Sequence, residues 1–143
     1  VGAVLATEAA AAGLTPGTHG STFGGNPLAM AVATTLLDVM LEPGFLESVE
    51  QKSQHMRQGL ARLQDQYPAL VAEIRGQGLL AGIKVNAEPR DVVTAALAEG
   101  LLVVGASDNV VRVLPPLNVA EHEISEGLDR LARALAAVSK SQT

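Results

Sequence analysis

Apolar side chains recur every three or four residues in the first half of the chain. Between Pro27 and about Leu41 this spacing places them along one face of an α-helix. Asn26 is a residue type that caps helices, and a proline is well suited to the first helical position. The same spacing continues through a charged stretch from Phe45 to Tyr67, which a proline follows. The pattern therefore predicts two consecutive helices.

Strand-like and helical stretches alternate in the second half of the chain. The pattern predicts a hairpin turned at Gly76-Gln77-Gly78 and a later helix that Gly100 ends. The predicted strands span 71–75, 79–85, 101–104 and 110–114, with a turn at 105–109, and the predicted helices span 89–99 and about 124–138. The order β-β-α-β-β-α is typical of an α+β domain, an antiparallel-rich sheet with its helices on one face.

The two ends of the chain have simpler patterns. Residues 1–7 have the composition of a strand, and the alanine-rich residues 8–13 predict a short helix. Residues 139–143 are polar and predict a tail. We expect three segments along the chain: a strand plus a glycine-rich loop, a pair of connecting helices, and the small α+β domain, with bounds 1–26, 27–68 and 69–143.

The amino-acid composition and net charge exclude several classes of protein. The 143 residues fit one domain or a small domain with an appendage, and a hydrophobic content of 48% excludes a disordered chain. A net charge of −5 without a Lys/Arg cluster argues against nucleic-acid binding. The absence of cysteine excludes disulfides and thiolate metal sites, and it suits a cytoplasmic protein. No apolar run approaches the ~20 residues that span a bilayer, so we expect no membrane partner.

An uncharged, glycine-rich stretch from Gly17 to Leu28 precedes the first long helix. It holds four glycines together with Thr18, His19, Ser21 and Thr22. Glycines let the backbone approach a ligand closely, and free N–H groups beside hydroxyls form a cradle for an anion. The stretch predicts a phosphate site. A P-loop nucleotide site is excluded because no lysine follows the glycines.

Each loop residue also has an ordinary structural interpretation. Thr22 either binds the phosphate or belongs to a common helix-entry loop, and Ser21 is either a ligand or a residue that stabilises the turn. Gly20 is more easily explained as a residue that frees the backbone. No partner in the sequence would orient His19 as a general base, so we interpret it as shaping the loop.

Among the other polar residues, Arg112 is the strongest candidate. It lies in an apolar strand, where we expect it to be buried and to need a carboxylate from the protein or from a ligand. We expect Arg75 to be structural. His55 and His122 are predicted on solvated helix faces, and no two histidines have metal-ligand spacing, so no metal site is expected.

Three separated motifs together resemble a known family. The loop reads Gly-Thr-His-Gly-Ser-Thr-Phe-Gly-Gly-Asn-Pro-Leu-Ala over residues 17–29. Residues 75–79 read Arg-Gly-Gln-Gly-Leu, with Gly82 following, and residues 111–117 read Val-Arg-Val-Leu-Pro-Pro-Leu ahead of an acidic last helix. These motifs resemble class III, fold-type I, pyridoxal-phosphate (PLP) aminotransferases, most closely the acetylornithine and ornithine branch.

The resemblance implies roles for particular residues. Thr22 would reach the PLP phosphate of the other subunit of a homodimer, with Ser21 and Gly20 beside it. Ser21 and Arg112 would contact the substrate. The implied reaction is transamination from N2-acetyl-L-ornithine to 2-oxoglutarate in arginine biosynthesis. Ornithine, succinylornithine and 4-aminobutyrate aminotransferases remain open, as does a non-catalytic small-molecule-binding α+β module.

The resemblance also implies that the chain is a C-terminal piece of such an enzyme. The family's catalytic lysine would precede Val1, and none of Lys52, Lys84 and Lys140 stands in its context. Segment 1–26 would then be the end of the large PLP-binding domain. We expect no catalytic residue in these 143 residues, no activity from them alone, and no PLP bound to them.

Overall fold

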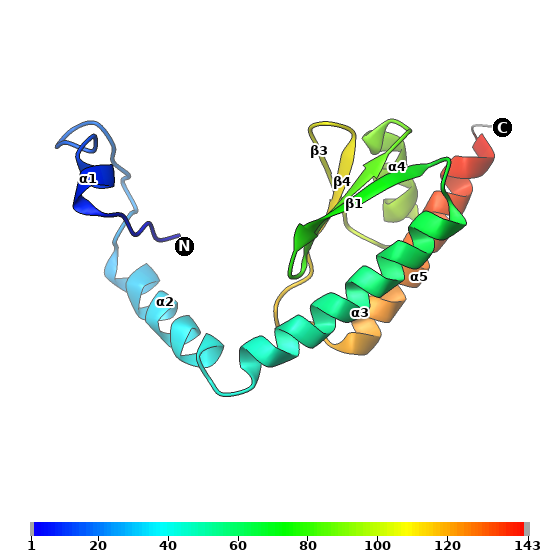
Figure 1. The fold of residues 1–143 in the computed structure, drawn as a ribbon. Coiled ribbons are helices and arrows are strands. Elements are labelled where there is room, and N and C mark those ends of the chain that lie inside the picture. Colours follow the sequence, from blue (N-terminus) through cyan, green and yellow to red (C-terminus); the bar gives the residue numbers. More distant parts are fainter. Residues whose placement is uncertain (1, 142–143) are drawn as a thin grey trace. The chain divides into compact units, whose positions relative to one another are not determined.

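The computed structural model describes residues 2–141, which form two compact units, Val1–Phe45 and Leu46–Thr143. The first unit contains a short helix α1 (Glu8–Ala11), the glycine-rich loop and helix α2 (Pro27–Met40), as Figure 1 shows. The backbone N–H of Ala10 donates to Thr7 Oγ1 at 3.3 Å, so Thr7 caps α1. The predicted short helix is therefore confirmed, and the predicted start of α2 at Pro27 is also confirmed.

The strand predicted over residues 1–7 is wrong for the described residues 2–7, which have no regular secondary structure; Val1 lies outside them. These residues are exposed, and Leu5 is 98% exposed. A strand needs a neighbour to accept and donate its backbone hydrogen bonds, and the described chain supplies none for this segment. Strand composition alone was therefore insufficient to predict a strand.

The second unit is an α+β domain, as predicted (Figure 1). Its strands and helices, in chain order, are α3 (Phe45–Gln66), β1 (Val71–Gln77), β2 (Leu80–Val85), α4 (Pro89–Ala98), β3 (Val104–Ala106), β4 (Val110–Val113) and α5 (Glu121–Ser141). The four strands are antiparallel and lie in the order β1-β2-β4-β3.

Alternate residues of β2 define the two faces of the sheet. Ala81, Ile83 and Val85 are buried, whereas the residues between them are less buried. The buried residues of α3, α4 and α5 join these side chains in one hydrophobic cluster. The three helices therefore cover one face of the sheet, and the opposite face stays open.

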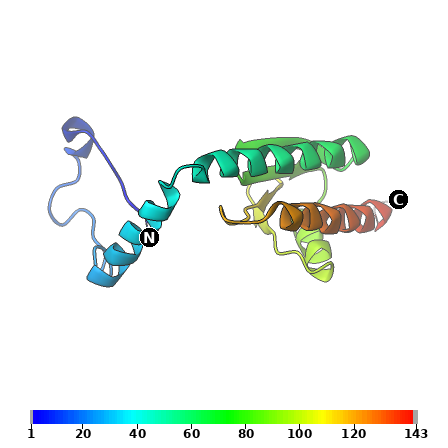
Figure 2. The same cartoon turned by 90° about the horizontal axis from the view of Figure 1, so that it is seen from below.

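Helices α3 and α5 run side by side in the same direction (Figures 1 and 2). His55 Nε2 lies 2.8 Å from Ser125 Oγ, and further along the pair Tyr67 donates its hydroxyl to the carbonyl of Ala132 at 3.4 Å. His55 is half-buried. Our prediction that it lies on a solvated helix face was wrong, because the sequence did not reveal which side of α3 would pack against α5.

The end of α4 explains why the following strand begins later than predicted. The backbone N–H of Gly100 donates to the carbonyl of Leu97, and that of Leu101 donates to the carbonyl of Ala96. Gly100 has a φ of +72°, so the helix ends in a Schellman motif. Leu101 is thereby used in the cap, and the strand predicted over 101–104 is instead β3 (Val104–Ala106). The turn predicted over 105–109 is correspondingly shorter.

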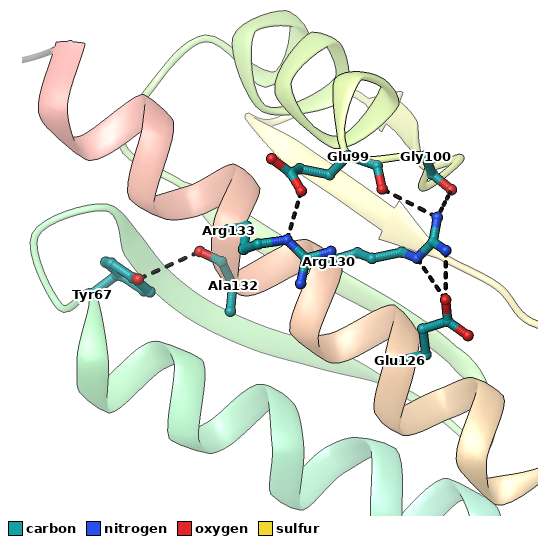
Figure 3. Close-up of polar contacts among 7 residues, drawn as sticks. All are labelled: Tyr67, Glu99, Gly100, Glu126, Arg130, Ala132 and Arg133. Atoms are coloured by element: carbon teal, nitrogen blue, oxygen red, sulfur yellow. Dashed lines mark hydrogen bonds and ion pairs between the residues drawn. The ribbon is translucent and has the colours of Figure 1, made fainter.

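Arginines of α5 strengthen the same helix end (Figure 3). Arg130 Nη1 donates to the carbonyls of Glu99 and Gly100 at 3.2 and 2.8 Å, and Arg133 Nε lies 2.6 Å from Glu99 Oε2. A cation at the C-terminal end of a helix compensates carbonyls that have no partner within the helix. These contacts attach α4 to α5.

The last helix also extends further than predicted. We expected a polar tail from residue 139, but α5 continues to Ser141, and residues 142–143 lie outside the described part of the chain. Ser141 Oγ donates to the carbonyl of Val138 at 2.8 Å. This hydrogen bond satisfies the Ser141 hydroxyl within the last turn of α5.

Within residues 2–141, no single helix is both long enough and apolar enough to cross a bilayer. Helices α2 and α3 reach that threshold only when they are counted together as a broken pair, and then by length and composition alone.

The turn between β3 and β4 is attached to the open face of the sheet through Asp108. Its two carboxylate oxygens bind different cations: Oδ2 lies 3.2 Å from Arg75 Nη2, and Oδ1 lies 3.0 Å from Lys84 Nζ. The pKa of Asp108 is held below its ordinary value, first by the hydrogen bond from Lys84, then by the charge of Lys84, and then by Arg75. The structural role expected for Arg75 agrees with this contact.

We predict that Asp108→Asn lowers the free energy of unfolding slightly near pH 7, because these exposed ion pairs are weak. Asparagine tolerates the positive φ of 62° at this position. A lowered pKa means that Asp108 stabilises the fold above the ordinary carboxyl range, about pH 4, and that this contribution disappears as pH falls through the lowered pKa. Urea unfolding between pH 3 and 7 should show the difference between the proteins vanishing at low pH.

The control is Asp65→Asn, which removes a carboxylate that has no ion pair in the described part of the chain. It should leave the pH dependence of unfolding unchanged. A difference between Asp108→Asn and the parent that grows as pH falls would contradict the assigned role of Asp108.

Candidate functional site

The loop before α2 is held by short-range hydrogen bonds at its two ends. At its start, the N–H and hydroxyl of Thr18 both donate to the carbonyl of Thr15, at 3.1 and 2.7 Å. At its end, Asn26 Oδ1 accepts the N–H of Ala29 at 2.9 Å, and Asn26 Nδ2 donates to the carbonyl of Phe23. The loop therefore leads directly into the capped N-terminus of α2.

Ser21 stabilises the middle of this loop. Its Oγ accepts the backbone N–H of Gly24 at 3.1 Å, which closes a turn over residues 21–24. The hydroxyl proton of Ser21 is not used in that bond, so it stays available to donate. The contact gives Ser21 a structural role without excluding a ligand-binding one.

Several hydrogen-bond donors of the loop have no partner among residues 2–141. Among them are the hydroxyl of Thr22 and the backbone N–H groups of Gly20, Ser21 and Thr22. Each of these residues is exposed, and no charged residue occurs from residue 9 to residue 37. Neighbouring donors without acidic neighbours are the arrangement that binds an anion. The residues present in the loop thus fit a phosphate group, such as that of PLP.

His19, in the same loop, is exposed and makes no hydrogen bond within the described residues. Nothing in this unit orients its ring toward a substrate position. We retain the interpretation that His19 shapes the loop, and we assign it no chemistry.

Arg112 lies on the open face of the sheet in the second unit. It pairs with Gly82 of β2 on one side and with Val104 of β3 on the other. The prediction that Arg112 is buried was wrong, because its side chain is exposed. The apolar neighbours along β4 indicated burial, but alternate residues of a strand point to opposite faces, and the core lies under the other face.

The charges around Arg112 leave its guanidinium available. Arg75 pairs across β1 and β2 with Gly82, so Arg75, Gly82 and Arg112 lie in one row across the sheet. Arg75 and Lys84 share Asp108, whereas Arg112 has no hydrogen bond or ion pair to the described residues. A guanidinium on a paired strand, without a protein carboxylate, is suited to bind a carboxylate ligand.

The three lysines of the chain have other surroundings. Lys52 Nζ donates to the carbonyl of Leu117 at 3.4 Å, Lys84 is paired with Asp108, and Lys140 lies in the last turn of α5. None of the three lies in the glycine-rich loop. Over residues 2–141, no three side chains of His, Cys, Asp or Glu gather in a group that could hold a metal ion.

The chain is similar to one family of known proteins over nearly its whole length. The family model "Aminotransferase class-III" matches residues 1–135. Acetylornithine aminotransferase 1 of Bradyrhizobium diazoefficiens is 56% identical over 143 residues, which is 100% of this chain and 35% of that protein. Acetylornithine aminotransferase of Agrobacterium fabrum is 51% identical over 99% of this chain and 36% of its own length. The chain thus spans about a third of these relatives.

Solved structures of aminotransferases are also similar to this chain. An ornithine aminotransferase from Toxoplasma gondii is similar with a TM-score of 0.77 and 35% identity, over 92% of this chain and 32% of that one. The N-acetylornithine aminotransferase from Stenotrophomonas maltophilia has a TM-score of 0.73 and 34% identity, over 82% of this chain and 33% of that one. The Toxoplasma structure is described with partial occupancy of PLP at its active site.

Proposed function

Since the chain belongs to the class-III aminotransferase family, we propose that it is part of a PLP-dependent enzyme that transfers an amino group from N2-acetylornithine to 2-oxoglutarate. The observation that carries the choice of donor is the identity of 51–56% with two proteins named acetylornithine aminotransferase, over essentially the whole chain. Arginine biosynthesis is the corresponding pathway.

Ornithine is the second candidate donor. An ornithine aminotransferase is among the similar solved structures, with 35% identity, and it matches this chain as well in fold as the N-acetylornithine enzyme does. Fold alone therefore does not separate the two donors. The higher sequence identities favour acetylornithine.

The loop donors are the groups that would hold PLP. Thr22 and the N–H groups of Gly20 and Ser21 would bind its phosphate, and their lack of intramolecular partners supports this role. When bound, PLP supplies an electron sink for the carbon that carries the amino group. The lysine that attaches PLP would lie outside these 143 residues.

The loop would serve the second subunit of a homodimer. All residues from 17 to 25 are exposed, which leaves the phosphate donors free to reach a neighbouring chain. In this arrangement segment 1–26 completes a large PLP-binding domain, and segment 69–143 is the small domain. We propose the cytoplasm as the compartment, with the absence of cysteine as support.

Arg112 would bind a substrate carboxylate. Its strand β4 lies between β2 and β3 and is paired on both sides, which fixes the backbone at this position. Its guanidinium offers paired N–H donors that match a carboxylate. Ser21, with its free hydroxyl proton, is the proposed second substrate contact.

The first prediction concerns the donor. The complete gene product with PLP and 2-oxoglutarate should use N2-acetylornithine with a kcat/KM at least about tenfold higher than ornithine. A coupled glutamate assay at matched donor concentrations measures both. Equal or reversed preference would replace acetylornithine by ornithine as the donor, and no glutamate from either would remove the proposed activity.

The second prediction concerns Thr22. Thr22→Ala in the complete protein should weaken PLP binding about 10- to 100-fold, since a hydrogen bond to a charged group contributes about 1.5–3 kcal/mol. Thr22→Ser keeps the hydroxyl and should bind PLP nearly as the parent does. Fluorescence titration of the PLP-free protein gives both dissociation constants. Unchanged affinity in Thr22→Ala would exclude Thr22 from the phosphate site.

The third prediction concerns Arg112. Arg112→Ala should raise the KM for 2-oxoglutarate by a factor that corresponds to about 2–3 kcal/mol, because the carboxylate loses a charged partner. Arg112→Lys keeps the charge but not the paired donors, so its KM should be intermediate. Steady-state kinetics and thermal unfolding should be measured together. A loss of thermal stability with an unchanged KM would assign Arg112 a purely structural role.

A further inference from the structure

The open face of the sheet carries the charged residues of the strands and of the turn between β3 and β4. They are Glu73, Arg75, Lys84, Asp108 and Arg112. Each charged strand residue is adjacent to a residue of the hydrophobic cluster or to one packed against it, so its own side chain points to the other face. With three cations and two carboxylates, this face has one net positive charge near pH 7.

The two carboxylates differ in their contacts. Glu73 forms no ion pair among residues 2–141, and its strand β1 is an edge strand that does not touch β4. Asp108 forms ion pairs with both Arg75 and Lys84, and it lies on the turn that leads into β4. Asp108 is therefore the carboxylate that balances the cations beside Arg112.

The side chain of Arg75 extends across β2 toward the turn before β4. A Cβ added to Gly82 would lie 3.5 Å from Arg75 Cγ and 3.9 Å from Arg75 Nε, so the arginine lies over Gly82. The same Cβ would lie 3.1 Å from Cγ1 of Val110, two residues before Arg112. The missing side chain at Gly82 thus lets Arg75 reach Asp108 over the strand that pairs with β4.

The spacing of the strands places these charges within electrostatic range of Arg112. Arg75 and Arg112 are separated by two interstrand spacings, about 10 Å, with Gly82 between them. The Debye length is about 30 Å at an ionic strength of about 10 mM and about 10 Å at about 0.1 M. At low salt, a carboxylate bound to Arg112 is therefore attracted by Arg75 and Lys84 and repelled by Asp108.

The two substrates of the proposed reaction respond differently to this field. 2-Oxoglutarate has two negative charges near pH 7, whereas N2-acetylornithine has one carboxylate and one ammonium group and no net charge. A change of one charge near Arg112 alters the binding of a dianion most, because the effects on the two opposite charges of the donor largely cancel.

We propose that Asp108 is a positioning residue for the substrate carboxylate. By binding Arg75 and Lys84, it limits the positive charge beside Arg112. It thereby sets how much more tightly the site binds a dianion than a donor without net charge. This role rests on the carboxylate-binding function proposed for Arg112, and it goes beyond the contribution of Asp108 to stability.

The electrostatic role and a purely structural role predict opposite effects of removing the charge. Without the carboxylate of Asp108, Arg75 and Lys84 are no longer balanced, so a dianion binds Arg112 more tightly. If Asp108 only held the turn, its loss would loosen β4 and would weaken binding or leave it unchanged. The sign of the change in affinity therefore separates the two roles.

Asp108→Asn in the complete gene product with PLP tests the proposal. At an ionic strength of about 10 mM, the variant should lower the KM for 2-oxoglutarate about two- to fivefold and leave that for N2-acetylornithine within about a factor of two. In about 1 M salt the Debye length is about 3 Å, and the difference from the parent should disappear. Titration calorimetry with glutarate, a dianion without a keto group, should show the same tightening as a dissociation constant.

Two further variants separate charge from structure. Lys84→Gln removes a cation of the same cluster, so it should raise the KM for 2-oxoglutarate about two- to fivefold at low salt. Asp65→Asn removes an exposed carboxylate from α3, on the covered face of the sheet, and should leave both KM values unchanged. Lys84→Gln also decides the question if Asp108→Asn does not fold.

Arg112→Ala distinguishes failure of this proposal from failure of the carboxylate role itself. If Arg112→Ala raises the KM for 2-oxoglutarate but Asp108→Asn raises it or leaves it unchanged at low salt, the role of Asp108 is overturned and the carboxylate site stands. A KM that Asp108→Asn lowers equally for both substrates and at high salt also overturns the role of Asp108. An unchanged KM in Arg112→Ala overturns both proposals.

Discussion

The packing of β2 against the three helices is the constraint on which the second unit depends. β2 pairs with β1 on one side and with β4 on the other, and its alternate residues Ala81, Ile83 and Val85 enter the hydrophobic cluster. Because alternate residues point to opposite faces, the same register places Gly82 and Lys84 on the open face. The packing of the core thereby determines which residues of the neighbouring strands lie on the open face of the sheet.

The open face of the sheet follows from that register. Arg75, Gly82 and Arg112 lie in one row, and Gly82 has no side chain to obstruct the arginines on either side. Asp108 forms ion pairs with Arg75 and Lys84, and Arg112 has no protein partner among the described residues. A shift of one residue in β4 would point Arg112 into the core. The proposed carboxylate site therefore depends on the register that the apolar side chains set.

The two units differ in how many apolar residues they bury. The second unit buries a continuous cluster under its sheet, whereas neither helix of the first unit has a buried residue. The helix cap at Asn26 and the turn closed by Ser21 shape the first unit, but hydrogen bonds of this kind contribute only about 1 kcal/mol each. The loop and α2 thus lack the buried apolar contacts that stabilise the second unit.

The sequence by itself determined the helices, the hairpin and the family, because helical periodicity, caps, turn glycines and three motifs are local patterns. It also located the loop donors and Arg112, whose roles stay predictions. Only the tertiary structure decided the exposure of Arg112, the contact of His55 with Ser125, and the absence of a strand in residues 2–7. The physical reason is that burial and strand formation depend on partners from distant parts of the chain, which no local pattern specifies.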